Sequence, residues 1–296
     1  MLKEFILLFE LYPAAYWLLV AVMGLLIGSF LNVVIHRMPL LMERQWRRDI
    51  RESYPEATLP DNDIDKLPTP YNLVVPRSAC PHCGHQITAL ENIPVVSWLL
   101  LLRGKCSQCK AAISKRYPAI ELLTGVLSGY VAWQFSFTAE GIGALLFLWL
   151  LLPMIFIDID KMLLPDQLTY PLLWLGLLFN LDGTFVSLND AVIGAVAGYL
   201  ALWSVYWGFK LLTGKEGMGY GDFKLLAGLG AWLGWQQLPL IILLSAGVGA
   251  VLGITMIMVQ GRDKAQPMPF GPYLAIAGFI ALLWGEQITQ WYLMRL

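Results

Sequence analysis

The chain has 296 residues, of which 57% are hydrophobic and 14% are charged, and its mean hydropathy is +0.62. Soluble globular proteins carry about 25% charged residues, so this composition excludes an ordinary soluble domain and predicts a protein that crosses a membrane several times. The net charge of −1 indicates no particular partner, and we expect no nucleic-acid binding.

Eight apolar runs approach the roughly 20 residues that a helix needs to cross a bilayer. They lie at residues 12–35, 117–135, 141–158, 167–181, 190–211, 221–236, 238–259 and 271–294. The first run has no basic region before it and no small-residue cleavage site, so we expect a retained helix rather than a signal peptide. The pattern predicts an all-α polytopic membrane protein with about eight transmembrane helices. A six-helix alternative, with two short runs re-entrant, fits the charge pattern less consistently.

Basic residues concentrate between the first and second apolar runs. This segment, from His36 to Pro118, holds 12 of the 20 Lys and Arg residues against 8 acids, and the positive-inside rule places it in the cytoplasm. In the eight-helix arrangement, the later connections that carry Lys or Arg also fall on the cytoplasmic side. We therefore predict three parts: a first transmembrane helix at 1–35, a cytoplasmic zinc-binding segment at 36–117 and a helix bundle at 118–296.

All four cysteines lie in the cytoplasmic segment, in two CxxC pairs. The sequence "CPHCGH" supplies Cys80 and Cys83, and "CSQCK" supplies Cys106 and Cys109. Two such turns can bring four thiolates to one tetrahedral zinc ion, and persistent disulfides are disfavoured in the reducing cytoplasm. The pattern predicts a closed zinc site with a structural role. Redox-active thiols and an iron–sulfur cluster are the alternatives.

Acidic residues at the ends of membrane helices are candidates for function, because a charge is costly to bury there. Asp158 ends the third apolar run, Asp160 follows two residues later, and Asp222 lies at the beginning of the sixth run. The predicted topology therefore puts Asp158 and Asp222 at the same cytoplasmic face. Two neighbouring carboxylates can divide the roles of general base and general acid, as in aspartic proteases. Asp166, which follows Pro165, is more typical of a helix cap, and Asp222 alone is also compatible with a cap.

Four motifs, found in the same order, closely resemble those of bacterial type IV prepilin peptidases, which are GxGD-type aspartyl proteases and N-methyltransferases. They are "GSFLNVVIHRMP", the region of the two CxxC pairs, "DIDKMLLPD" and "GMGYGDFKLLA". The resemblance implies that Asp158, seven residues before Pro165, and Asp222, in the GxGD motif, form the catalytic pair. Asp160 is the alternative to Asp158. We also expect the glycines at 217, 219 and 221 to give a substrate backbone access to this pair.

The resemblance implies an activity with two steps in the bacterial inner membrane. The short basic leader of a prepilin or a type II secretion pseudopilin is cleaved at the cytoplasmic face, and the new N-terminus is then methylated with S-adenosylmethionine as donor. The implied partners are the substrates, the lipid bilayer and the pilus or secretion assembly machinery. A peptidase without methyltransferase activity and a non-enzymatic, zinc-containing assembly scaffold are the alternatives.

The methyl-transfer site is expected in the segment of the four cysteines, but its residues are less sharply indicated. Gly104, in "LRGKC", matches a glycine of the family in this part of the chain. Glu91 is a candidate proton acceptor on chemical grounds, because a neutral amine must attack the methyl group. A salt-bridge role for Glu91 is an equal alternative. The sequence contains no glycine-rich motif typical of a nucleotide-like donor, so it does not locate the S-adenosylmethionine site.

Overall fold

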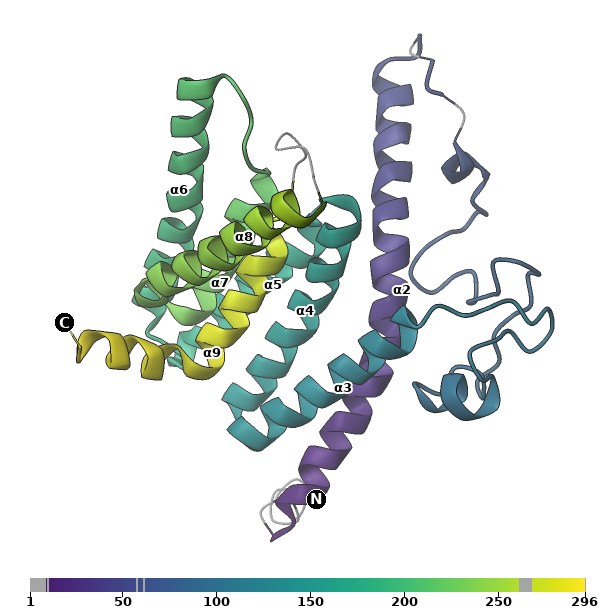
Figure 1. The fold of residues 1–296 in the computed structure, drawn as a ribbon, viewed down its shortest axis with the longest axis horizontal. Helices are drawn as coiled ribbons and strands as arrows, with labels where there is room; N and C mark the ends of the chain where they lie inside the picture. Colours follow the sequence, from purple (N-terminus) through teal and green to yellow (C-terminus); the bar gives the residue numbers. More distant parts are fainter. Residues whose placement is uncertain (1–8, 10, 57, 61, 261–267, 296) are drawn as a thin grey trace. The chain divides into compact units, whose positions relative to one another are not determined.

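The computed structural model describes residues 9, 11–56, 58–60, 62–260 and 268–295. Its long elements are all helices, and between Ser53 and Arg116 the described chain is mostly irregular, with two short helical turns (Figure 1). The long helices are α2 (Pro13–Ser53), α3 (Arg116–Phe135), α4 (Ala139–Lys161), α5 (Asp166–Phe179), α6 (Leu188–Thr213), α7 (Tyr220–Leu233), α8 (Leu238–Gln260) and α9 (Gly271–Leu293). Short helical turns are η1 (Asp63–Lys66), η2 (Ser97–Leu101), η3 (Asn180–Asp182) and η4 (Trp235–Gln237). The all-helical prediction is confirmed.

One long helix stands at each of the eight apolar runs, but the helices differ in their ability to cross a membrane. Among the described residues, four stretches are long and apolar enough by length and composition: Pro13–Ser53, Ala139–Lys161, Leu188–Thr213 and Trp235–Thr255. Helices α5 and α7 have only 14 residues each, about 21 Å at 1.5 Å per residue, against a hydrocarbon core of about 30 Å. The number of eight membrane crossings therefore stays a prediction. Arg262 and Lys264, which belong to the last of the basic connections predicted to be cytoplasmic, lie outside the described residues.

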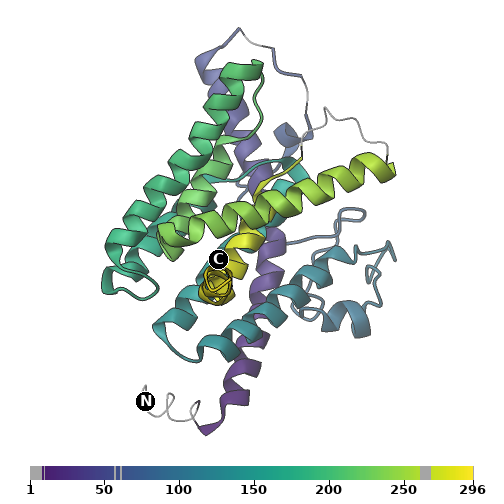
Figure 2. The same ribbon diagram turned by 60° about the vertical axis from the view of Figure 1, so that its left-hand side comes forward.

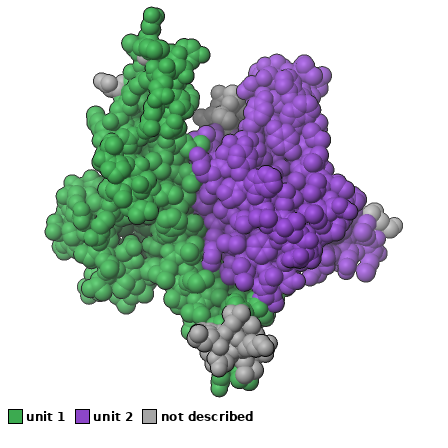
Figure 3. Space-filling model, turned by 180° about the vertical axis from the view of Figure 1, so that it is seen from behind, with its two compact units in different colours: residues 1–137 green, residues 138–296 purple. Residues whose placement is uncertain are grey.

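The chain divides into two compact units, Met1–Phe137 and Thr138–Leu296 (Figure 3). In the first unit, α2 and α3 pack against each other through glycines. A Cβ atom at Gly28 would lie 2.8 Å from the Cα of Glu121, and one at Gly125 would lie 2.6 Å from a methyl carbon of Leu25. Small residues that allow such close packing are typical of contacts between helices in membranes.

Helix α2 continues well past the end of the first apolar run, as a single helix to Ser53 with Pro39 inside it. The beginning of the segment predicted to be cytoplasmic therefore belongs to the same helix as the first apolar run. The polar residues that follow fold back on this extension and hold it. Arg37 donates to the carbonyls of Asn72 and Pro76 at 2.9 and 2.7 Å, and buried Arg47 pairs with Asp65 at 2.8 Å.

In the second unit, α7 is the most buried helix, and it packs against α5, α6 and α9 (Figures 1 and 2). Its contact with α6 depends on small residues: a Cβ at Gly194 would collide with the carbonyl oxygen of Gly230, and a Cβ at Gly198 would lie 2.6 Å from that of Leu226. Gly194 and Gly198 therefore allow the backbones of the two helices to approach closely. Gly247 of α8, in contrast, has no neighbouring atom within 4 Å of its Cβ position.

The C-terminal end of α7 is held by aromatic packing and buried polar contacts. Trp232 lies against Phe147, Phe179 and Phe185, with ring centroids 5.2–5.4 Å away, and its indole donates to the Leu172 carbonyl at 2.7 Å. The buried Asn180 side chain donates to the carbonyls of residues 231 and 232. These contacts fix the position of the helix whose other end carries Asp222.

Candidate active site and cysteine cluster

Asp158 lies in the last turn of α4, and its main chain closes the end of that helix. Met162 adopts a left-handed conformation with φ of 53°, and its amide donates to the Asp158 carbonyl at 2.9 Å. The side chain is only 5% exposed. Its carboxylate accepts a hydrogen bond from the amide of Gly271, at the start of α9, at 3.0 Å.

Asp222 is the third residue of α7, and it too is buried, with 7% exposure. Gly219 occupies the N-cap position, so the alternative of Asp222 as the N-cap residue does not hold. The carboxylate accepts a hydrogen bond from the main chain of Gly219, and it lies within electrostatic reach of Asp158. The fold of the second unit therefore brings together two buried carboxylates that are 64 residues apart, counted as 222 minus 158.

The other aspartates of the same motif have different surroundings. Asp160 is exposed. Asp166 begins α5 but makes no capping bond, because the N-cap position belongs to Pro165. Its carboxylate instead pairs with Lys224 at 2.6 and 2.9 Å, so the capping prediction for Asp166 is wrong. Of these three aspartates, Asp158 is the one whose side chain is buried.

The glycines that precede Asp222 are not all open to a substrate. A Cβ at Gly217 would lie 2.9 Å from the ring of Phe209, and one at Gly221 would lie 2.7 Å from the Cβ of Leu164. These two glycines make room for side chains of the same chain. At Gly219, the nearest side-chain atom is Oδ2 of Asp222, 3.8 Å from the Cβ position. The expected backbone access therefore fits Gly219 and not the other two.

The four cysteines form one compact cluster in the first unit. None is in a disulfide, and their sulfurs all lie within 4.8 Å of one another. The Cys80 and Cys109 sulfurs are 3.7 Å apart, and those of Cys83 and Cys106 are 3.9 Å apart. Tetrahedral zinc with Zn–S bonds of about 2.3 Å requires sulfurs about 3.8 Å apart. The cluster therefore has the donor set and the spacing of a four-sulfur metal site.

The two CxxC turns have the same local structure, displaced by 26 residues. The Ala79–Gln86 bridge closes the first turn and the Lys105–Ala112 bridge closes the second. The equivalent left-handed positions are Gly84, with φ of 73°, and Lys110, with φ of 60°. Two copies of one turn thus bring their sulfurs together, and the repeated CxxC spacing is the sequence signal for both.

Comparisons with known proteins agree along nearly the whole chain. Residues 22–135 match the Bacterial Peptidase A24 N-terminal domain, and residues 145–254 match the Type IV leader peptidase family. A protein of Aeromonas hydrophila is 62% identical over 281 residues, which are 95% of each chain. The chain belongs to the type IV leader peptidase family.

Two further relatives of this family member are similar over nearly their whole length. A Pseudomonas aeruginosa protein is 60% identical over 282 residues, 95% of each chain. A Pectobacterium carotovorum protein is 49% identical over 284 residues, 95% of this chain and 97% of the relative. These two proteins and the one from Aeromonas hydrophila are named prepilin leader peptidase/N-methyltransferase. No solved structure matches the chain.

Glu91, the candidate proton acceptor of this leader peptidase family member, is held in a network of hydrogen-bond donors beside the cysteines. The Thr88 amide and hydroxyl each donate to its carboxylate at 2.9 Å, and His85 Nε2 lies 3.1 Å away. Hydrogen bonds from Ser107 and Thr88 lower the pKa of Glu91 to about 2. These hydrogen bonds fix the Glu91 carboxylate in the turn beside the cysteines, and its role as a proton acceptor stays a prediction.

Gly104 meets a local demand of the fold. Its φ of 73° lies in the left-handed region, and a Cβ there would lie 3.1 Å from the Trp98 ring. The Gly104 amide donates to the Trp98 carbonyl at 2.9 Å. Glycine is thus needed for the turn that leads into the second CxxC pair, whatever further role it has in this family.

Gly271 and Glu121 make contacts near the candidate sites that the sequence did not predict. Gly271 holds Asp158, and the only sequence signal for it is a Gly-Pro pair at the start of the last apolar run. Glu121, in the N-terminal half of α3, accepts the amide of Val95 at 2.8 Å, and so ties the cysteine-bearing segment to α3.

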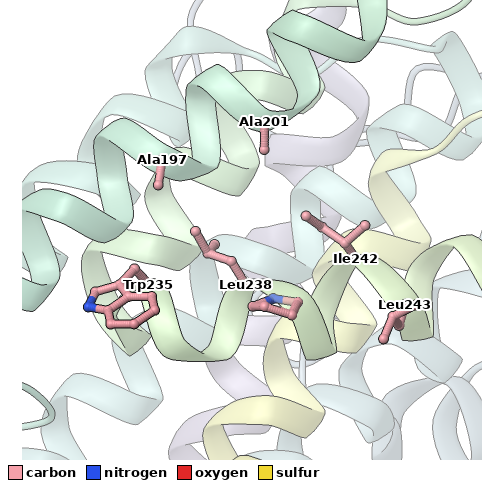
Figure 4. A pocket seen from close by; sticks show the side chains of 7 residues that line it. Ala197, Ala201, Trp235, Leu238, Ile242 and Leu243 are labelled. Carbon is pink, nitrogen blue, oxygen red and sulfur yellow. The ribbon is translucent and has the colours of Figure 1, made fainter.

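An apolar groove of about 500 Å³ lies between α6 and the beginning of α8 (Figure 4). It is lined by Ala197, Ala201, Trp235, Leu238, Pro239, Ile242 and Leu243. None of these side chains can transfer a proton, and neither aspartate of the buried pair lines the groove. We therefore do not include it in the candidate site.

Proposed function

We propose that this chain removes the leader peptide of prepilins and of type II secretion pseudopilins, with Asp158 and Asp222 as the catalytic pair. The observation that carries the proposal is that these two carboxylates are both buried in the second unit and lie within electrostatic reach of each other. It occurs in a chain about 60% identical to proteins named prepilin leader peptidase/N-methyltransferase.

The chemistry requires only the two carboxylates and a water molecule. One aspartate is ionised and takes a proton from the water molecule, while the water oxygen bonds to the scissile carbonyl carbon. The other, protonated, gives its proton to the amide nitrogen as the C–N bond breaks, which leaves a carboxylic acid on the leader and an amine on the mature protein. Burial favours this division of labour, because two close carboxylates in a poorly solvated site resist simultaneous ionisation.

We place this pair at the cytoplasmic face of the bacterial inner membrane, in a bundle with eight crossings. The support is the excess of basic residues at 36–118, the basic residues near the end of α4 and the end of α6, and the positive-inside rule. A substrate with a basic leader in the cytoplasm and an apolar helix in the bilayer would then present its cleavage bond at the depth of Asp158 and Asp222. Pilus and secretion assembly proteins are the partners that such products imply.

Methyl transfer to the new N-terminus is the second proposed activity, and we assign it to the segment at 36–117, with the peptidase bundle at 118–296. Cys80, Cys83, Cys106 and Cys109 would hold a zinc ion, which would fix the fold of this segment and take no part in the transfer. S-adenosylmethionine would supply the methyl group to the neutral amine. The support is the geometry of the sulfur cluster and the names of the relatives.

The test uses full-length protein in lipid nanodiscs with a prepilin substrate and labelled S-adenosylmethionine. Asp158→Asn and Asp222→Asn should each abolish cleavage while they still methylate a pre-cleaved substrate, and Asp160→Asn is the matched control that should retain both activities. Cleavage by either of the first two variants would overturn the catalytic assignment. Cleavage by the wild type without methyl label on the product would indicate a peptidase that lacks methyltransferase activity.

A further inference from the structure

The first turn of α9 contacts Asp158, although it lies beyond residues 145–254, which match the peptidase family. The amide of Gly271 donates to Oδ2 of Asp158 at 3.0 Å, in a buried position. Asp158 lies at the C-terminal end of α4, where the partial negative charge of the helix end disfavours a carboxylate. The free amides at the N-terminus of α9 offset this effect. The carboxylate therefore depends on a second helix for its position.

Gly271 leaves the space that this contact needs. A Cβ atom at position 271 would lie 2.7 Å from Oδ2 of Asp158 and 3.1 Å from both terminal methyl carbons of Leu164. Real Cβ atoms essentially never approach another heavy atom to less than 3.0 Å, so an alanine would force the carboxylate to move. The φ of Gly271 lies outside the left-handed region, so the glycine is required here for space and not for backbone conformation.

Leu164 connects this contact to the other half of the acid pair. The same side chain lies against Gly271 and against Gly221, whose Cβ position is 2.7 Å from the Leu164 Cβ. Gly221 directly precedes Asp222. The starts of α7 and α9 therefore pack on one leucine, which lies in the connection between Asp158 and α5.

We propose that Gly271 is a positioning residue of the leader peptidase: its amide holds one oxygen of Asp158, and its missing side chain leaves that carboxylate room to face Asp222. This inference rests on the proposed function, because it takes Asp158 as a catalytic group. It assigns the beginning of α9 to the active site and makes α9 part of the peptidase.

The kinetic test compares Gly271→Ala with Gly247→Ala, a glycine-to-alanine change in α8 where no atom lies within 4 Å of the Cβ position. A displacement of about 1 Å at a catalytic group can lower the rate about 100-fold. Gly271→Ala should lower kcat for leader cleavage by about that factor, with KM and the methylation of pre-cleaved substrate within a few-fold of wild type. Gly247→Ala should cleave normally. A Gly271→Ala enzyme with wild-type kcat would overturn the proposal.

A second measurement tests the contact itself and needs no activity. The apparent unfolding temperature is measured for wild type, Gly271→Ala, Asp158→Ala and the double variant. Gly271→Ala should destabilise the wild type clearly but the Asp158→Ala protein much less, because the truncated side chain no longer collides. Equal destabilisation in the two backgrounds would overturn the proposal. Cleavage by Asp158→Asn would instead defeat the proposed function, and it would leave the result of this cycle unchanged.

Discussion

Lys224 of α7 and Asp166 of α5 form an ion pair in which Nζ lies 2.6 Å from Oδ1 and 2.9 Å from Oδ2. The pair joins the "LPD" sequence that follows Asp158 to the "GDFK" sequence that contains Asp222. The ammonium group also lies 5.2 Å from the ring centre of Tyr170. The two protease motifs are thus connected by a contact that involves neither catalytic candidate.

This ion pair predicts that Asp166 supports the site without taking part in the chemistry. The side chains of Lys224 and Asp166 are 27% and 45% exposed, and partly exposed pairs contribute about 1 kcal/mol or less. We expect Asp166→Asn to lower the unfolding free energy by at most about this amount and the cleavage rate by less than about tenfold. Parallel assays of stability and cleavage check this. Complete loss of cleavage in a folded Asp166→Asn protein would contradict it.

The contact of α6 with α7 predicts a sharp dependence on side-chain size. A Cβ at Gly194 would collide with the Gly230 carbonyl, whereas Gly208 of the same helix has no atom within 4 Å. Overpacking a tight contact costs about 1–3 kcal/mol, so Gly194→Ala should destabilise the protein by about this amount. Gly208→Ala is the control and should be neutral or slightly stabilising. Unfolding midpoints in detergent measure both, and equal midpoints for the two variants would contradict the prediction.

The features that the sequence predicted well are those that local patterns determine. Apolar runs located the eight long helices, because a long, nearly uninterrupted apolar stretch is typical of a buried or membrane-spanning helix. The spacing of Cys80, Cys83, Cys106 and Cys109 predicted a cluster, because each CxxC turn brings two sulfurs together. Motifs and the expected topology predicted Asp158 and Asp222 as a pair. The structure brings these two side chains within electrostatic reach of each other.

The features that could not be predicted depend on contacts between distant segments. The Gly271 amide holds a carboxylate 113 residues away, and no local pattern marks such a partner. Gly221 was expected to give a substrate access, but the Leu164 side chain lies against it, and this depends on how the connection before α5 packs. Helix α2 runs on to Ser53 because Arg37 and Arg47 find partners in a segment that has no regular pattern.

The sulfur cluster predicts bound zinc that depends on both CxxC turns. Cys83→Ser and Cys109→Ser each remove one sulfur from a different turn, so both should lose most of the metal and lower the stability of the segment, because metal binding and folding are coupled. His82→Ala is the control: His82 is exposed and is not one of the four clustered residues, so its loss should leave the zinc content unchanged. Elemental analysis of purified protein gives zinc per chain. Full zinc content in Cys83→Ser would contradict the prediction.

The low pKa of Glu91 predicts how its contribution to stability changes with pH. Hydrogen bonds from Ser107 and Thr88 lower this pKa from 4.5 to about 2. The folded state therefore stabilises the ionised carboxylate relative to the unfolded state. The stability difference between wild type and Glu91→Gln should therefore be full above pH 4.5 and shrink as pH falls toward about 2. Glu52→Gln, at an exposed position of the same unit, is the control. Glu91→Gln should keep methylating wherever it stays folded. A folded, zinc-replete Glu91→Gln protein without methylation would instead support the proton-acceptor role.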